Sequence, residues 1–139
     1  MQTASDRKAP TMPTLVVDAN ATFATVLFLS AAPKEKFQSP GVQDVSADGT
    51  PKWVAQLAVT YNAENGMASA SEVLNVSIAS HGNPVDGIAP GSPVMPDALR
   101  VGWNAPEKRD NGSIRGGRPW YSATGLRSSL MAGARKGGE

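Results

Sequence analysis

Hydrophobic and polar residues alternate with a period of two in three segments of the chain. Residues 51–61 place Trp53, Ala55, Leu57, Val59 and Tyr61 on one face and Val54, Gln56, Ala58 and Thr60 on the other. Residues 72–80 alternate around Leu74, Val76 and Ile78, and residues 99–104 around Leu99, Val101 and Trp103. A half-buried β-strand repeats every two residues, whereas a helix repeats about every 3.6. The alternation therefore predicts three strands.

Two further strand regions are expected toward the ends of the chain. The first covers residues 15–17 and 23–29, with a turn or bulge at 18–20, because this run is rich in Thr, Val and Phe. The last covers residues 118–127, in which Trp120 and Tyr121 would point to opposite faces.

Turn and loop residues separate these strands. Asp48-Gly49 lies between extended segments and predicts a hairpin turn, since both residues tolerate a positive φ. Residues 81–96 hold four prolines and three glycines, so no regular element is expected there. Residues 106–119 form a basic loop. Residues 33–40 form a charged connection, from which Phe37 is expected to pack back on the core.

Five or so strands without a convincing helix predict an all-β fold. Uneven turns between such strands are typical of a small antiparallel β-barrel, and an OB-like barrel is the preferred interpretation. A small β-sandwich is the alternative, because the pattern alone does not separate the two. One domain is expected over residues 14–130, between a flexible leader at 1–13 and a disordered tail at 131–139.

Composition narrows the possible chemistry. The 139 residues include no cysteine and one histidine, which excludes disulfides, thiolate metal sites and a cysteine nucleophile. His81 precedes Asp86 in a breaker-rich segment without an obvious nucleophile, so a turn capped by the aspartate is expected there rather than catalysis. No glycine-rich phosphate loop ends in Gly-Lys-Ser/Thr. We therefore expect a protein that is not an enzyme and that holds no metal or cofactor.

The most apolar run, residues 21–32, bears on the location of the protein. At about twelve residues, this run is shorter than the roughly twenty that a membrane helix requires. We interpret it as a buried strand, and we expect no membrane association and a cytoplasmic protein.

Positive charge is concentrated in the C-terminal part of the chain. The net charge is only +1, but residues 1–90 carry five Lys/Arg against eight Asp/Glu, whereas residues 91–139 carry eight against four. A locally positive surface attracts a polyanion at close range. A solvated face with a soluble tail would give the same distribution of charge.

Aromatic residues lie on or beside the strands that carry several of these cations. Single-stranded nucleic acid needs flat rings on which bases stack and cations along the phosphate path. Trp53 and Trp103 share faces with leucines and are expected to be largely buried. Tyr121 is expected to be exposed, because only small residues flank it on its face, and Trp120 fits either environment. The candidate nucleic-acid-binding residues are Arg100, Lys108, Arg109, Arg115, Arg118, Trp120, Tyr121 and Arg127.

Residues 40–128 resemble a known family. Gly49-Thr-Pro-Lys-Trp53 opens an alternating strand, Glu72-Val-Leu-Asn-Val-Ser-Ile follows, and Trp120-Tyr-Ser-Ala-Thr-Gly-Leu-Arg127 comes after a proline-rich connection. Together these segments are similar to the small plasmid replication, integration and excision activator proteins of actinomycete integrative elements. The order of elements also resembles the small OB-fold single-strand DNA-binding proteins of phages. The resemblance implies an accessory or regulatory protein of a mobile genetic element that acts with DNA.

Two functions of different kinds are compatible with these features. The first is a non-enzymatic DNA-associated protein that binds nucleic acid, expected to be single-stranded, through a basic, aromatic-bearing sheet face. In this reading the 108–118 loop closes over the bound strand. The alternative is a structural or interaction protein that forms a homo-oligomer or docks onto a replication or recombination protein.

Overall fold

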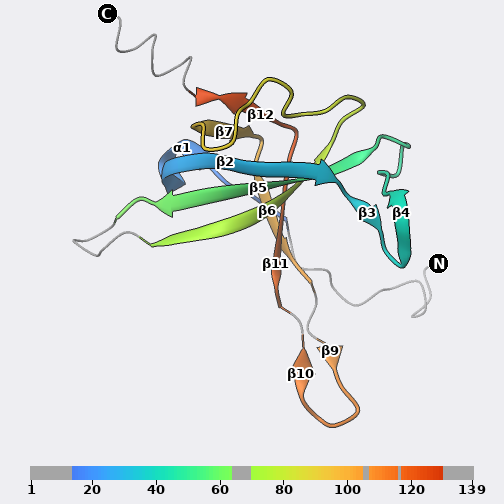
Figure 1. The fold of residues 1–139 in the computed structure, drawn as a ribbon. Helices are drawn as coiled ribbons and strands as arrows, with labels where there is room; N and C mark the ends of the chain where they lie inside the picture. Colours follow the sequence, from blue (N-terminus) through green and yellow to red (C-terminus); the bar gives the residue numbers. More distant parts are fainter. Residues whose placement is uncertain (1–13, 64–69, 105–106, 116, 130–139) are drawn as a thin grey trace, which may run out of the picture.

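The computed structural model describes residues 14–63, 70–104, 107–115 and 117–129. Its regular structure is almost entirely β-strand, with one four-residue helix (Figure 1). The elements in chain order are β1 (Leu15–Val16), α1 (Ala19–Thr22), β2 (Phe23–Pro33), β3 (Glu35–Lys36), β4 (Ser39–Gln43), β5 (Lys52–Tyr61), β6 (Ser71–Ala79), β7 (Val94–Asp97), β8 (Arg100–Trp103), β9 (Glu107–Lys108), β10 (Ile114–Arg115), β11 (Pro119–Ala123) and β12 (Gly125–Ser128). The prediction of an all-β fold is confirmed. The expected leader at 1–13 and tail at 131–139 lie outside the described residues.

Six strands form one sheet in the order β1-β8-β11-β6-β5-β2. The long strands β2, β5 and β6 follow one another as an antiparallel meander, in which Leu57 lies opposite Phe28 on one side and Leu74 on the other. β11 lies parallel to β6, with Ser122 opposite Ser77, and β8 is antiparallel to β11. The prediction of a fully antiparallel sheet is therefore wrong at one pair. The long connection between β6 and β11 supplies the crossover that a parallel pair requires.

The predicted strand at 118–127 is divided in two. β11 ends and β12 begins on either side of Thr124, whose backbone N–H donates to the carbonyl of Asp97 at 2.9 Å. β12 pairs antiparallel with β7, a strand that the sequence did not predict because Pro96 lies within it. Among the residues that the structure describes, β7 pairs along its length only with β12, and a strand with one free edge tolerates a proline.

The core gathers the inward faces of β2, β5 and β6 with residues from the segment that contains β7 and β8. The largest side chains with less than 2% exposure are Leu57, Ile78, Leu99, Val59, Val76 and Val94. Burying one such aliphatic side chain contributes about 1.5–3 kcal/mol. The alternation predicted for β5 and β6 is confirmed, because polar residues between the buried ones, such as Gln56 and Asn75, are exposed on the opposite face. We call this opposite face the outer face of the sheet.

Two short hairpins extend from the sheet (Figure 1). β3 pairs with β4, and β9 pairs with β10 within the predicted basic loop. The predicted Asp48-Gly49 turn is confirmed: Gly49 has a φ of 89°, and the Ser46 N–H donates to the carbonyl of Thr50 at 2.8 Å. Phe37 is 76% exposed, so the expectation that it packs on the core is wrong. The β3–β4 hairpin carries its ring away from the core.

The short helix α1 takes the place of the turn expected at 18–20. The Asp18 carboxylate caps it by accepting the N–H of Ala21 at 3.1 Å. Among the described residues there is no helix with the length and hydropathy needed to cross a membrane. The described pairing of the main sheet ends at β1 and β2, so a closed barrel is not found in this part of the chain.

Candidate functional site

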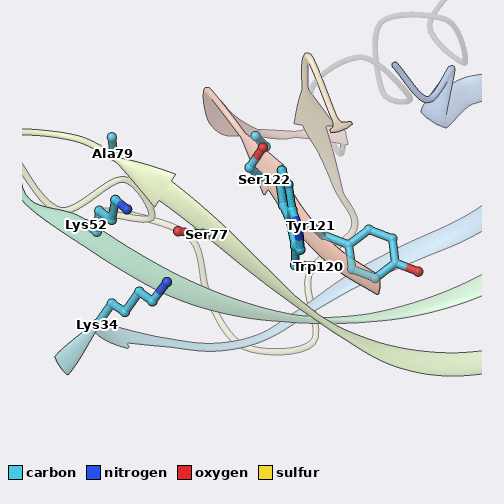
Figure 2. A pocket seen from close by; sticks show the side chains of 8 residues that line it. Lys34, Lys52, Ser77, Ala79, Trp120, Tyr121 and Ser122 are labelled. Carbon is cyan, nitrogen blue, oxygen red and sulfur yellow. The ribbon is translucent and has the colours of Figure 1, made fainter. Parts of the chain in front are cut away.

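A hollow of about 370 Å³ lies on the outer face, where β11 pairs with the end of β6 beside the start of β5. Its lining residues are Lys34, Lys52, Ser77, Ala79, Trp120, Tyr121, Ser122 and Ala123. They come from the start of the β3–β4 hairpin, from β5 and β6, and from β11 (Figure 2). Segments from the N-terminal and C-terminal parts of the chain therefore meet at this site.

The indole ring of Trp120 forms one wall of the hollow. Trp120 lies opposite Gly102 in the β11–β8 pair, and its side chain is 40% exposed. A Cβ atom built on residue 102 would lie 2.2 Å from Cζ2 of the indole. The ring can rest against β8 only because residue 102 is glycine. The other side of the indole ring is accessible from solvent. An exposed indole held in this way offers a flat apolar surface.

Two lysines stand across the hollow from Trp120. Figure 2 shows the amino groups of Lys34 and Lys52 on the same side of β11 as the indole ring. Their backbones are joined, because the Lys34 N–H donates to the carbonyl of Lys52 at 3.0 Å. The Lys52 ammonium lies 3.8 Å from the Asp44 carboxylate, a loose pair between partly exposed groups. Such a pair contributes about 0–1 kcal/mol and leaves the ammonium able to bind an anion.

Small side chains form the floor of the hollow. Ser77 and Ser122 lie opposite each other in the parallel β6–β11 pair, and Lys52 lies opposite Ala79 in the β5–β6 pair. Side chains that face each other across a pair of strands share one face of the sheet. The serine hydroxyls can donate or accept hydrogen bonds, so the floor is polar but carries no fixed charge.

Tyr121 lies on the other face of the sheet, and the expectation that its ring is exposed is wrong. It pairs with Val76 and Val101, both buried, and its ring packs against the core. Burial raises the pKa of the Tyr121 hydroxyl, the charge of Glu72 raises it further, and Tyr61 opposes this rise. Figure 2 shows its ring pointing away from the two lysines. Tyr121 therefore packs against the core, whereas Trp120 provides the exposed aromatic ring of the hollow.

Tyr61 packs against the same core as Tyr121. Tyr61 donates a hydrogen bond to the Glu72 carboxylate at 2.7 Å, which joins β5 to β6. Burial and this carboxylate raise the pKa of Tyr61 well above its usual value, so the hydroxyl remains a hydrogen-bond donor even in alkaline solution. Phe23 packs beside it with ring centroids 5.3 Å apart. This cluster stabilises the end of the β5–β6 pair that lies opposite to the end carrying the hollow.

The predicted cations are only partly brought together. Arg100 is exposed and lies opposite Ser122, so it shares the outer face with Trp120. Arg118 is exposed directly before β11, and its carbonyl accepts the N–H of Asn104 at 3.2 Å. Lys108 and Arg109 are exposed on the β9–β10 hairpin, which leaves the sheet next to Trp120. The side chain of Arg115 lies outside the described part of the structure.

Arg127 is separated from this group. It lies in β12, in the ribbon with β7, and its Nε donates to the Asp97 carboxylate at 2.5 Å. Asp97 belongs to β7, so this ion pair ties the two strands of the ribbon together. The expectation that Arg127 lies beside Arg118 on one binding surface is not met, and a role in holding the ribbon explains its position.

The other two tryptophans are half-buried rather than largely buried as predicted. Trp53 lies on the core side of β5, and its Nε1–H donates to the carbonyl of Ser80 at 2.9 Å. Trp103 lies in β8 opposite Pro119. The indole of Trp53 is thus engaged in a structural hydrogen bond, unlike the ring of Trp120.

Sequence reasoning missed Lys34 and Ser77 as parts of the site. Ser77 could have been found, because it alternates with buried residues of β6 and so had to lie on the outer face. Lys34 could not, because its position depends on where the β3–β4 hairpin folds back against β5. Both residues line the hollow.

Neither a histidine–carboxylate pair nor a metal site is found among the described residues. His81 and Asp86 are both exposed, and the carboxamide of Asn83, not Asp86, caps the turn by accepting the N–H of Val85 at 3.0 Å. Within the described ranges no three His, Cys, Asp or Glu side chains come close enough to hold a metal ion. Comparisons with protein-family models, with curated proteins and with solved structures find no match to this chain.

Proposed function

We propose that this chain is a non-enzymatic, DNA-associated protein that binds single-stranded nucleic acid across the outer face of its sheet. The observation that carries the proposal is the open face of the Trp120 indole, which looks onto a hollow bounded by Lys34 and Lys52. A base would stack on the indole, and a phosphate would lie between the two ammonium groups. Ser77 and Ser122 would meet the base edge or the sugar.

Energetic considerations favour an unpaired strand over a duplex. Stacking of one base on an aromatic side chain is worth about 1–3 kcal/mol, and it requires a base whose face is free. Bases in a duplex are covered by their neighbours, so a ring held against the sheet cannot reach between them. Arg100, Arg118, Lys108 and Arg109 would extend the positive path from the hollow toward the β9–β10 hairpin.

We also propose that the sheet belongs to an OB-like barrel, a partly open Greek-key architecture that binds oligonucleotides on one face. Three features support this. β2, β5 and β6 form a meander, and β11 then pairs between β6 and β8. The segment before β7 also reaches the far edge of β2, where Leu27 bridges to Pro93 and the Phe28 N–H donates to the carbonyl of Ser92 at 2.9 Å.

The cellular role in this proposal comes from the sequence resemblance. The segment from Trp120 to Arg127 is similar to the end of the plasmid replication, integration and excision activator proteins, so we propose an accessory or regulatory protein of a mobile genetic element, acting in the cytoplasm. Trp120, the first residue of that segment, is also the exposed ring of the hollow.

Titration with oligonucleotides at low salt tests the proposal. Binding of single-stranded DNA should quench tryptophan fluorescence, and affinity should fall as a power of the salt concentration. Trp120→Ala should remove most of the quenching and lower affinity about fivefold or more. Trp53→Phe is the matched control. The indole of Trp53 faces the core, so this substitution should leave the affinity for DNA unchanged. Absence of binding to single- and double-stranded DNA alike would refute the proposal.

One observation favours the second candidate function, an interaction protein. β1 is an edge of the described sheet, and its two residues are apolar and exposed, with Leu15 at 49% and Val16 at 71%. An exposed strand edge can pair with another chain. Light scattering with and without DNA separates the candidates, because a stable oligomer indifferent to DNA would favour docking through β1.

A further inference from the structure

Phe37 is one of the two most exposed large apolar side chains in the described part of the molecule. It lies at the turn of the β3–β4 hairpin and is 76% exposed. Single exposed apolar residues are common on protein surfaces, so exposure alone assigns no role. The charged residues that precede it and the place where its hairpin begins distinguish Phe37 from an incidental surface residue.

The hairpin is built to hold this ring away from the core. Lys36 pairs with Ser39 across the turn, and Gln38 adopts a φ of 59°, which few residues other than glycine take. The Glu35 carboxylate accepts the N–H of Gly41 at 2.9 Å and so fastens the two strands together. The acidic group is thereby engaged within the hairpin, between the basic residues Lys34 and Lys36.

The base of this hairpin is a wall of the hollow. Lys34, which directly precedes β3, lines the hollow, and its carbonyl accepts the N–H of Asp44 at 2.7 Å. On the returning strand the Gln43 side chain donates to the carbonyl of Lys52 at 2.8 Å. Both strands are thus anchored where Lys34 and Lys52 stand. Three residues of extended chain separate Phe37 from Lys34 by at most about 10 Å.

We propose that Phe37 is a second stacking ring, so that a single strand seated in the hollow continues along the β3–β4 hairpin and places a further base on Phe37. This inference rests on the proposed function, and it specifies the path along which the bound strand leaves the hollow. Lys34 and Lys36, two residues apart on the segment that leads to Phe37, supply cations along this path. A polyanion with flat bases can both stack on the ring and pair with the lysine ammonium groups. An apolar protein surface would contact the ring but would not pair with these charges.

Binding of oligothymidylates of two lengths to the full chain tests the inference. Phe37 lies within about 10 Å of Lys34, and one strand rises by about 3.4 Å per nucleotide. A strand of about two nucleotides therefore samples the hollow alone, whereas one of about twelve, within the 4–16 nucleotides that a single OB-type domain covers, also reaches the hairpin. Phe37→Ala should weaken binding of the longer strand about fivefold or more, and should leave the shorter one unchanged. Phe37→Trp should restore the affinity and add fluorescence that the longer strand quenches.

Val42→Ala is the matched control, since it removes an exposed apolar side chain from the same hairpin without removing a ring. Equal affinity of wild type and Phe37→Ala for both lengths would overturn the inference while leaving the proposed function intact. If the wild type binds neither length, the proposed function itself fails. A loss of self-association in Phe37→Ala without loss of DNA binding would assign Phe37 to a protein contact instead.

Discussion

The indole of Trp120 rests directly on the backbone of Gly102. A Cβ at residue 102 would lie 2.2 Å from Cζ2, 2.5 Å from Cε2 and 2.8 Å from Cη2 of the ring, distances that no real Cβ tolerates. The two residues face each other across the β11–β8 pair. The position of the indole wall of the hollow is therefore set by the absence of a side chain on the neighbouring strand.

Gly102→Ala should displace the indole while leaving the strand in place. Its Cβ would occupy the space of the ring, so Trp120 must turn toward solvent or into the hollow. We expect a shifted tryptophan emission maximum and an affinity for single-stranded DNA lowered about tenfold, which lies within the range for one stacked base. Gly82→Ala is the control, because a Cβ there meets nothing within 4 Å. Equal effects of the two substitutions would argue against a positioning role.

Ser77→Leu should fill the hollow from its floor. Ser77 is half-buried on the outer face, and a leucine there would take up the space between Trp120 and Lys52. Loss of oligonucleotide binding with an unchanged melting temperature is expected, as judged by fluorescence titration and circular dichroism. Ser71→Leu places the same side chain on β6 outside the hollow. If Ser77→Leu binds as tightly as the wild type, the hollow is not the binding site.

Arg118→Ala and Arg127→Ala should have different effects. Arg118 is exposed beside β11, so its loss should reduce the slope of log affinity against log salt by about 0.7, the value for one phosphate contact on a single strand. Arg127 is paired with Asp97, so its loss should leave the slope unchanged and lower the free energy of unfolding by up to about 1 kcal/mol. Salt titrations and urea unfolding measure the two effects. An equal change of slope in both variants would contradict the separation of these residues.

Asp48 makes stability depend on pH below about 4. The Ser46 hydroxyl and then the Thr50 hydroxyl and N–H donate to its carboxylate and lower its pKa from 3.8 to about 2. Because the folded-state pKa is depressed, the stabilisation is complete above the unfolded value and is lost as pH falls through about 2. Ser46→Ala should raise the pKa of Asp48, as followed by NMR titration of its carboxyl. An unchanged titration midpoint in this variant would contradict the assigned cause.

The strands of the central meander were predictable because burial follows a period of two. Leu57, Val76 and Ile78 lie on the faces that the alternation assigned to the core, and the Asp48-Gly49 turn followed from local backbone preferences. β7 was missed because Pro96 resembles a breaker, although it is accommodated opposite Leu126 at a free edge. Local pattern carries no information about which edge a strand will occupy.

The candidate site was predictable only in part, because local pattern does not show which strands will lie side by side. Arg100 and Trp120 were named from their residue types, and the sheet places both on the outer face. Tyr121 was assigned the wrong face because its neighbours along the strand are small, whereas its neighbours across the sheet, Val76 and Val101, are buried. Those neighbours, like the position of Lys34, are determined by pairing between distant segments.

The parallel contact between β6 and β11 has a consequence for how the protein is made. Ser77 and Ser122 meet only after the intervening chain has looped back, and closing such a loop is slow compared with forming a local hairpin. During synthesis the meander can assemble early, yet this edge of β6 stays vacant until β11 has left the ribosome. The cavity therefore cannot exist before β11 has been made, and no fragment ending before β11 can carry it.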